Sequence, residues 1–368
     1  MRQRPLQAVL LVYAIEQSDL GGDALSHEDR AQASREAADE RAVPAAGDPS
    51  AQITGSSERF LARRADALLA RLRVRSPGID RVLAAAAGPT GFDRSILLLG
   101  FLLGFAIAFA DGHRIDIFAY PLIVLVLWNL IVYLILIARA FHLRQPNEAA
   151  GTVAAREAAA LHRDGFFRRW LARTYANRVY ARIDALITHS IGFNAPLAPG
   201  LRRFAADWRE LGRPLFRERA RRLLHLSAIL AAAGLMAGYF VRGVLLRQNA
   251  GWGNTIFGPA SAHTALVTLY GAASAIKRIP IPSAQDLQTL AWTGATGGGQ
   301  AGPWLRLIYW TALLYIVLPR LLGLVLTTLS LWRRSATLRT PATFPGYLAA
   351  VLRSLPPAPE SKPAESSG

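Results

Sequence analysis

Residues Ile117–Ala138 read IFAYPLIVLVLWNLIVYLILIA, a run of 22 residues without a charged side chain. A helix needs roughly 20 apolar residues to cross a bilayer, because each residue adds about 1.5 Å. Three further apolar runs, of 15, 19 and 26 residues, are Ile96–Ala110, Leu223–Val241 and Leu307–Trp332. None of the four carries the polar face, repeating every 3.6 residues, of a helix that covers a soluble core. The sequence therefore predicts an all-α integral membrane protein with four transmembrane helices and additional cytoplasmic helical segments.

The composition points the same way. The 368 residues include 42 Lys+Arg and 25 Asp+Glu, a formal net charge of +17, yet only 18% of residues are charged and 52% are hydrophobic. This apolar content excludes disorder over most of the chain. The lack of cysteine excludes disulfide scaffolds, thiolate metal sites and a cysteine nucleophile. Because no recognition motif accompanies the positive charge, we expect no nucleic-acid partner.

The arginines predict the orientation of the spans. Lys and Arg close to span ends favour the cytoplasmic side, and 16 Arg lie near the span ends on one side against four on the other. We therefore expect both termini and the middle loop in the cytoplasm. The expected regions are a cytoplasmic helical region (1–94), two spans (95–138), a basic cytoplasmic loop (139–222), a third span (223–241), an extracytoplasmic segment (242–306), a fourth span (307–332) and a partly disordered cytoplasmic tail (333–368).

The regions outside the spans show helical and loop signals. The apolar run Leu6–Ile15 lacks a small-residue cleavage site, which favours the first helix of a cytoplasmic domain over a signal peptide. A capping box at Ser26–Asp29 begins a polar helix, and Pro44–Ser57 has linker composition. In the outer segment, Thr264–Ala275 is too short to span and fits an interfacial or re-entrant helix. The tail from Pro356 has a disordered composition.

The middle loop is the most basic part, with 17 Arg against seven Asp+Glu. Its arginines alternate with an apolar stripe of period four in a predicted amphipathic helix. Such a helix can bind anionic headgroups or an acidic partner; alternatively its stripe packs on the N-terminal helices while its arginines are solvated. The stripe is Phe167, Leu171, Tyr175, Val179, Ile183 and Ile187, and the candidate docking residues are Arg168, Arg169, Arg173, Arg178 and Arg182.

Catalytic signatures are nearly absent. No phosphate-binding loop, metalloprotease, serine-hydrolase or zinc pattern occurs. The pair Ser274 and Lys277 matches the SxxK pattern of penicillin-recognising enzymes, but the companion elements are missing. We therefore expect a protein that is not an enzyme and has no catalytic residue, metal or cofactor.

The membrane runs contain two features of interest. Small residues four apart, Gly100 with Gly104 and Gly234 with Gly238, form ridges that allow close helix packing. Arg320 follows Pro319 near the middle of the last run, where a charge costs roughly 2.5–3.5 kcal/mol to insert. It either occupies a polar cavity that binds an anion, with Asn129, Tyr133 and His225 as polar neighbours, or reaches the inner headgroups because the span is shifted outward.

Several stretches resemble an uncharacterised family of bacterial inner-membrane proteins (domain of unknown function 2868). They are Ala119–Leu122, Trp128–Leu130, Arg219–Leu226, Gly238–Gly243, Ala250–Trp252 and Leu318–Leu322. The chain departs from the family pattern at Trp252–Phe257, where an acidic residue and a Ser-Thr-Phe run are expected. The resemblance implies an inner-membrane location and no catalytic residues. It also implies an association with a P-loop GTPase-like protein, for which the chain would be a membrane anchor or accessory subunit.

Two functions therefore compete. The first is a membrane partner for a cytoplasmic protein, with anionic headgroups as a second partner. The alternative is a small-solute or anion permease subunit that uses Arg320. In the permease alternative, several copies with four spans each would assemble to line a pore. A homo-oligomer is therefore part of this alternative. The scarcity of polar groups within the spans favours the first function.

Overall fold

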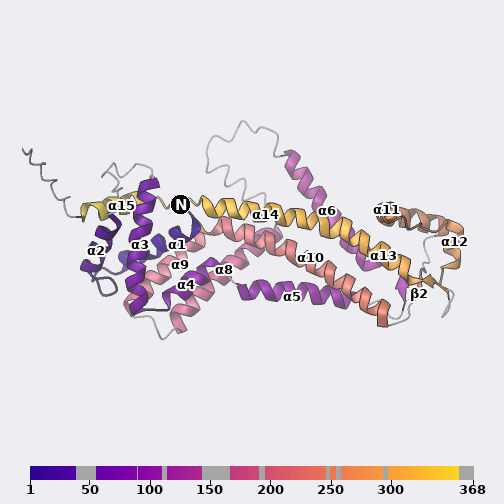
Figure 1. Cartoon of the computed structure of the whole chain (residues 1–368), viewed down its shortest axis with the longest axis horizontal. Coiled ribbons are helices and arrows are strands. Elements are labelled where there is room, and N and C mark those ends of the chain that lie inside the picture. Colours follow the sequence, from indigo (N-terminus) through magenta and orange to yellow (C-terminus); the bar gives the residue numbers. More distant parts are fainter. Residues whose placement is uncertain are drawn as a thin grey trace, which may run out of the picture. The chain divides into compact units, whose positions relative to one another are not determined.

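The computed structural model describes residues 1–38, 55–88, 90–109, 114–142, 166–189, 195–245, 249–253, 258–292 and 297–355. The described chain is mostly helical and divides into two compact units (Figure 1). Unit 1 comprises Met1–Pro89, Phe167–Glu218 and Ser330–Gly368. Unit 2 comprises Thr90–Phe166 and Arg219–Leu329.

Unit 1 is a helical domain assembled from three separate stretches of chain. Its elements are α1 (Gln3–Ser18), α2 (His27–Ala38), α3 (Gly55–Arg75), α4 (Ile79–Ala87), α8 (Phe166–His189), η1 (Ala195–Leu197), α9 (Ala198–Leu211), α15 (Phe344–Arg353) and the adjoining ends of α10 (Arg213–Leu245) and α14 (Leu318–Ala336). The region boundaries predicted from the sequence lie at 94/95, 222/223 and 332/333. The corresponding boundaries between the two units lie a few residues earlier.

Helix α1 is the core of unit 1. Every residue from Leu6 to Glu16 is buried, as expected of a helix that is apolar on all sides. It packs against α3 and α9, and α9 approaches closely because Gly200 lies against the backbone of Ile15, where a Cβ would come within 2.7 Å of the Ile15 Cα. The apolar run Leu6–Ile15 is thus a domain helix in this structure.

Unit 2 contains the apolar helices. Its elements are α5 (Thr90–Ile107), β1 (Ile115–Asp116), α6 (Tyr120–His142), most of α10, β2 (Asn249–Gly251), α11 (Pro259–Lys277), α12 (Ala284–Thr289), β3 (Gly299–Gln300), α13 (Ala301–Ala312), the π-helical turn η2 (Leu313–Val317) and most of α14. Each of the four predicted apolar runs forms a helix. Helix α10 begins ten residues before its apolar run because Arg213–Arg222 continue the same helix.

A small sheet joins the ends of three helices in unit 2 and is an addition to the predicted all-α fold. Strand β1 pairs in parallel with β2, which pairs antiparallel with β3. Helix α11 is longer than the predicted 12-residue stretch, and it is anchored in the core of the unit by Leu266 and Tyr270, both fully buried. The Tyr270 hydroxyl donates a hydrogen bond of 2.8 Å to the carbonyl oxygen of Ile117.

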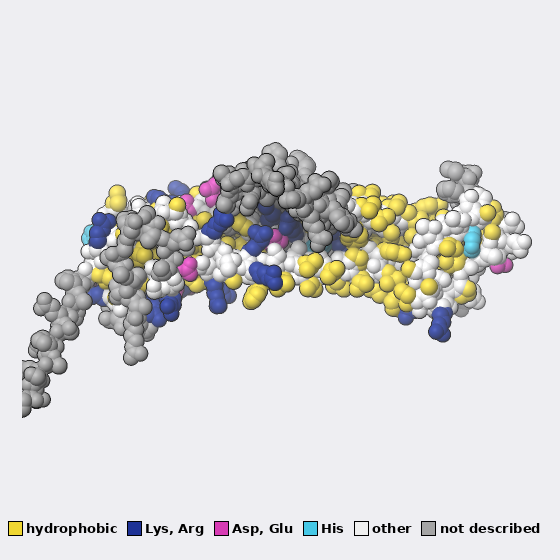
Figure 2. Space-filling view, turned by 90° about the horizontal axis from the view of Figure 1, so that it is seen from above, with side chains coloured by type: hydrophobic (Ala, Val, Ile, Leu, Met, Phe, Trp, Pro, Cys, Tyr) yellow, Lys and Arg dark blue, Asp and Glu magenta, His cyan; other side chains and the backbone are white. Residues whose placement is uncertain are grey.

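Two helices of the described chain are long and apolar enough to cross a membrane: Arg213–Leu245 and the continuous helix Ala301–Ala336. Only 28% and 22% of their most apolar windows are buried, so they differ from the core helices of a soluble protein, which are mostly buried. Figure 2 shows hydrophobic side chains gathered on the surface of unit 2. The spans predicted at Ile96–Ala110 and Ile117–Ala138 are helical up to Ile107 and from Tyr120, respectively, but their described residues do not meet the same test, so four spans remain a prediction.

Some predictions fall on residues outside the described part of the chain. They concern most of the linker Pro44–Ser57, residues 143–165 of the basic loop and the tail from Pro356. Upstream of that tail lies α15, a helix of unit 1 that no predicted element covers.

Candidate functional site

The candidate site in unit 2 is built around Arg320 of α14. Its side chain is 8% exposed, and its Nε donates a hydrogen bond of 2.7 Å to Oδ1 of Asn129 on α6. The guanidinium also lies over the ring of Tyr133, 5.7 Å from the ring centroid. Two of the three polar neighbours predicted for Arg320 therefore contact it directly.

Asn129 is held in one orientation by hydrogen bonds along its own helix. Its Nδ2 donates to the carbonyl oxygen of Leu125 at 2.7 Å, one turn earlier. Its Oδ1 accepts from the Tyr133 hydroxyl at 3.3 Å, one turn later. Residues four apart lie on one face of a helix, so Leu125, Asn129 and Tyr133 present the amide oxygen to Arg320.

The third predicted neighbour, His225 of α10, packs against α14 about one helical turn beyond Arg320. A Cβ at Gly323 would come within 2.5 Å of the His225 ring, so the imidazole packs directly on the backbone of α14 at this glycine. Gly323 follows Arg320 by three residues. His225 thus borders the site, and the structure gives it no hydrogen bond to Arg320.

The turn before Arg320 is wider than an α-helical turn. Leu313–Val317 form a π-helix, and Pro319 follows after one residue, Leu318. Proline lacks an N–H donor and its ring clashes with the carbonyl four residues earlier, here that of Tyr315. A π-helical turn places this clash in a widened segment, and such turns occur frequently at functional sites.

The chemistry available at this site is that of a fixed cation. An arginine stays protonated in proteins, so it can bind an anion but cannot exchange a proton in catalysis. Among the described residues no carboxylate pairs with Arg320, and none of them form a group of three His, Cys, Asp or Glu that could hold a metal. The site can therefore bind negative charge.

The four predicted packing glycines lie where α5 meets α10. A Cβ on Gly100 would be 3.0 Å from the carbonyl oxygen of Ser227. A Cβ on Gly104 would overlap the carbonyl oxygen of Ala231. From the other helix, a Cβ on Gly234 would overlap the carbonyl oxygen of Phe101, and one on Gly238 would be 2.5 Å from the Ala108 Cβ. The two helices therefore touch backbone to backbone.

Arg242 fixes the end of α5, a role that the sequence did not reveal. Its side chain is 1% exposed; one guanidinium nitrogen bonds the carbonyl oxygen of Ala108 and the other that of Arg114, the latter at 3.1 Å. A cation at the C-terminus of a helix satisfies carbonyls that lack helical partners. Arg242 is thus a structural contact as well as one of the charges counted for topology.

The SxxK residues have other partners. The Ser274 hydroxyl donates to the carbonyl oxygen of Ile279 at 2.7 Å. The Lys277 ammonium lies 3.7 Å from the ring centroid of Trp310. The two residues do not form the acylating pair that the pattern suggests.

The predicted docking helix is α8. Its apolar stripe is buried at Tyr175, Val179, Ile183 and Ile187, whereas Arg173, Arg178 and Arg182 are exposed. The side chains of Arg168 and Arg169 lie outside the described residues, as do those of Phe167 and Leu171. The stripe is therefore core of unit 1, and the arginines form a basic outer face on the same helix.

A buried polar network joins four helices of unit 1, and no sequence pattern predicted it. Arg64 of α3 is 4% exposed and binds both carboxylate oxygens of Glu16 on α1, at 3.0 and 2.6 Å. It also donates to Ser34 of α2 at 2.8 Å and to the Tyr347 hydroxyl of α15 at 2.6 Å. Burial, reinforced by Glu16, raises the pKa of Tyr347 well above its usual value. The network therefore fixes α1, α2, α3 and α15 to one another.

Asp19 fixes the loop after α1. Its carboxylate accepts hydrogen bonds from the backbone N–H groups of Asp23, Ala24 and Leu25 and from Arg30. Burial alone would raise the pKa of Asp19, but these donors outweigh burial and lower it. The stabilisation is therefore present above the ordinary aspartate pKa and is lost as the pH falls through the lowered value.

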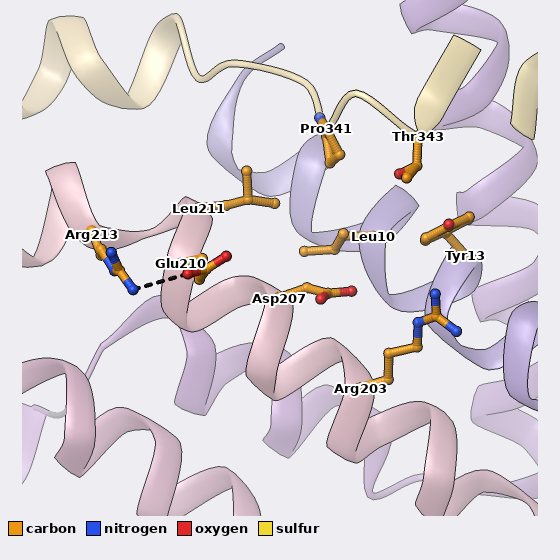
Figure 3. Close-up of a pocket in the computed structure, with 9 residues that line it drawn as sticks. All are labelled: Leu10, Tyr13, Arg203, Asp207, Glu210, Leu211, Arg213, Pro341 and Thr343. Atoms are coloured by element: carbon orange, nitrogen blue, oxygen red, sulfur yellow. Dashed lines mark hydrogen bonds and ion pairs between the residues drawn. The ribbon is translucent and has the colours of Figure 1, made fainter. Parts of the chain in front are cut away.

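Unit 1 also contains a pocket of about 430 Å³ between α1, α9 and the segment before α15 (Figure 3). Its wall combines the cations Arg203 and Arg213 with the carboxylates Asp207 and Glu210. Burial raises the pKa of Asp207; Arg203 opposes this rise and Glu210 adds to it. Glu210 pairs with Arg213 at 3.0 Å, so charge in the wall is largely balanced and selects no single class of ligand.

No family model, curated protein or solved structure matches this chain.

Proposed function

We propose that the protein is a multi-pass inner-membrane anchor whose unit 2 lies in the bilayer and whose unit 1 docks a cytoplasmic partner. One observation carries this proposal. Among the described residues, 22 of the exposed large apolar side chains belong to unit 2 and four to unit 1. Soluble proteins rarely expose contiguous apolar surface beyond a few hundred Å², whereas lipid covers such a surface without cost.

The exposed apolar residues lie on each of the predicted spans. Examples are Leu102 on α5, Leu127 on α6, Phe240 on α10 and Leu322 on α14, all more than half exposed. The excess of arginine on one side of the spans supports the orientation with both termini in the cytoplasm. We accordingly propose four spans, with unit 1 inside and the region of α11, α12 and the sheet outside.

Cysteine labelling tests this topology cleanly because the chain has no cysteine of its own. Gln285→Cys on α12 and Arg81→Cys on α4 both place a thiol at an exposed position. In intact spheroplasts a membrane-impermeant maleimide is expected to label Gln285→Cys fully. It should label Arg81→Cys only after lysis, because a sealed bilayer separates the reagent from unit 1. Equal labelling of both positions before lysis would contradict the orientation.

The resemblance described above supports a P-loop GTPase-like protein as the partner, and the basic face of α8 supplies a surface of suitable charge. Reversing Arg173, Arg178 and Arg182 to Glu is expected to weaken co-purification of a stoichiometric nucleotide-hydrolysing partner at least tenfold, because like charges across an interface repel. The control reverses Arg59, Arg81 and Arg353, exposed arginines elsewhere in unit 1. It applies the same change in net charge and should leave binding intact.

The docking hypothesis fails if crosslinked native membranes yield no such partner for the wild-type chain. Solute flux in reconstituted vesicles would then support the permease alternative. Among the described residues of unit 2 the buried polar side chains are few: Asn129, Arg242, Thr311 and Arg320. Such a sparse set offers no polar path along the helices, which supports the anchor.

A further inference from the structure

We propose that Arg320, Asn129 and Tyr133 form a binding site for a phosphate-type oxyanion within the apolar helices of unit 2. The proposal rests on the placement of unit 2 in the bilayer. The ligand is either the phosphate of an anionic lipid headgroup or a free oxyanion, since both present the same oxygens to the arginine.

The charge of Arg320 favours a bound anion. Arg320 is a buried cation, and its described partners, Asn129 and Tyr133, are both neutral. The four predicted spans contain no Asp or Glu anywhere in their sequence. A buried charge without a counter-charge is strongly destabilising. A bound anion would remove this cost.

The geometry of the Arg320 guanidinium also favours a bound oxyanion. The hydrogen bond to Asn129 uses only Nε of Arg320 and sets the plane of the guanidinium. The guanidinium carbon lies over the Tyr133 ring, 5.7 Å from the ring centroid. The two terminal nitrogens have no hydrogen-bond partner among the described residues and carry four N–H donors in a fixed fork. This fork matches two oxygens of a phosphate group, which is the reason that arginine is favoured for bidentate oxyanion recognition.

The depth of Arg320 within the apolar helices places the site within reach of anions. His225 packs on Gly323, which places these two residues of α10 and α14 at one level. Arg222 lies three residues before His225, and Arg320 lies three residues before Gly323. Because the two helices run in opposite directions, Arg222 and Arg320 lie on opposite sides of this level. At 1.5 Å per residue, the backbone of Arg320 is therefore only about 9 Å further into the apolar helices than that of Arg222. Arg222 ends the basic stretch of α10, so the site lies within reach of headgroup phosphates and of cytoplasmic ions.

Thermal unfolding of the purified full chain in neutral detergent tests the proposal. The probes are phosphatidylglycerol in mixed micelles, phosphatidylcholine as the neutral lipid, and inorganic phosphate. Saturating probe is expected to raise the melting temperature of the wild-type protein by about 2–4 °C at a hundredfold excess over Kd. Stabilisation by phosphatidylglycerol alone assigns the site to a lipid headgroup, and stabilisation by inorganic phosphate as well assigns it to a free oxyanion.

The variants identify the residue responsible. Arg320→Met keeps the length of the side chain and removes the charge, so without anion it should melt at or above the wild-type temperature and should not respond to either anion. Arg320→Lys keeps a charge without the fork and should respond more weakly. Arg306→Met, at an exposed position of α13 on the same long helix, is the matched control and should respond like wild type.

Three results would overturn the proposal. They are a wild-type protein stabilised by neither anion, an equal response of phosphatidylcholine and phosphatidylglycerol without any phosphate effect, or an anion response that persists in Arg320→Met. If that variant fails to fold, Asn129→Leu replaces it, and the wild-type comparison of the three probes still decides. Failure of membrane insertion is detected separately by the cysteine labelling, so the two proposals fail in distinguishable ways.

Discussion

Replacing Arg64 by alanine is expected to lower the free energy of unfolding of unit 1 by about 3–5 kcal/mol. The guanidinium is 4% exposed and meets Glu16, Ser34 and Tyr347 through four hydrogen bonds. Removing it leaves the Glu16 carboxylate buried without its counter-charge and leaves a cavity among four helices. The cost therefore exceeds the value of the lost hydrogen bonds alone.

A thiol reporter confines the measurement to unit 1. Val12→Cys places the one cysteine of the chain at a fully buried position of α1. The rate at which the thiol of this Val12→Cys reporter is modified at increasing urea concentrations gives the free energy of opening of unit 1. The rate is measured with Arg64 present and with Arg64→Ala. Arg213→Ala is the control, because its partner Glu210 and Arg213 itself are 70% and 60% exposed and such pairs contribute less than about 1 kcal/mol. Equal losses in the two variants would show that the buried network does not stabilise unit 1.

Gly104→Ala is expected to destabilise unit 2 by about 1–3 kcal/mol, and Gly104→Leu by more. The new Cβ would overlap the carbonyl oxygen of Ala231, and neither atom can rotate away, because one is fixed to its Cα and the other belongs to the backbone of α10. Helices α5 and α10 must then separate, which also opens the contact of Gly234 with Phe101. The loss of close contact is costly because van der Waals packing drives helix association in lipid.

The matched control for this substitution is Gly271→Ala on α11. A Cβ at Gly271 meets nothing within 4 Å, and alanine favours a helix by roughly 1 kcal/mol over glycine. The midpoint of heat-induced loss of monodisperse protein in detergent should fall for Gly104→Ala and stay level or rise for Gly271→Ala. A Gly104→Ala variant as stable as wild type would show that α5 and α10 do not meet in this way.

The sequence predicts those parts of the molecule that depend on local pattern. Apolar runs predict the helices of unit 2. The spacing of four between Gly100 and Gly104, and between Gly234 and Gly238, predicts close helix packing, because small residues one turn apart line one helix face. The buried stripe of α8 follows from the same periodicity. Whether that stripe forms core or binds a partner is set by the rest of unit 1, which no local pattern encodes.

Features that join distant residues could not be predicted. Glu16 and Arg64 look like ordinary helix-surface charges, and only the packing of α1 against α3 buries them together. The polar neighbours of Arg320 could be named because few polar residues occur in the spans, but the sequence did not distinguish Asn129 from His225 as its direct contact. The sheet was missed because strands of two or three residues carry no alternating pattern.

The hydrogen bond between Tyr347 and Glu16 links residues 331 positions apart. At roughly 5–20 residues per second, a ribosome needs on the order of 15–65 s to synthesise that stretch. During this interval α1, which is buried from Leu6 to Glu16, has been made while α15 has not. All the predicted spans are synthesised in the same interval. Completion of unit 1 therefore reports that the last predicted span has been made, and a partner that recognises only the completed unit would ignore chains still in synthesis.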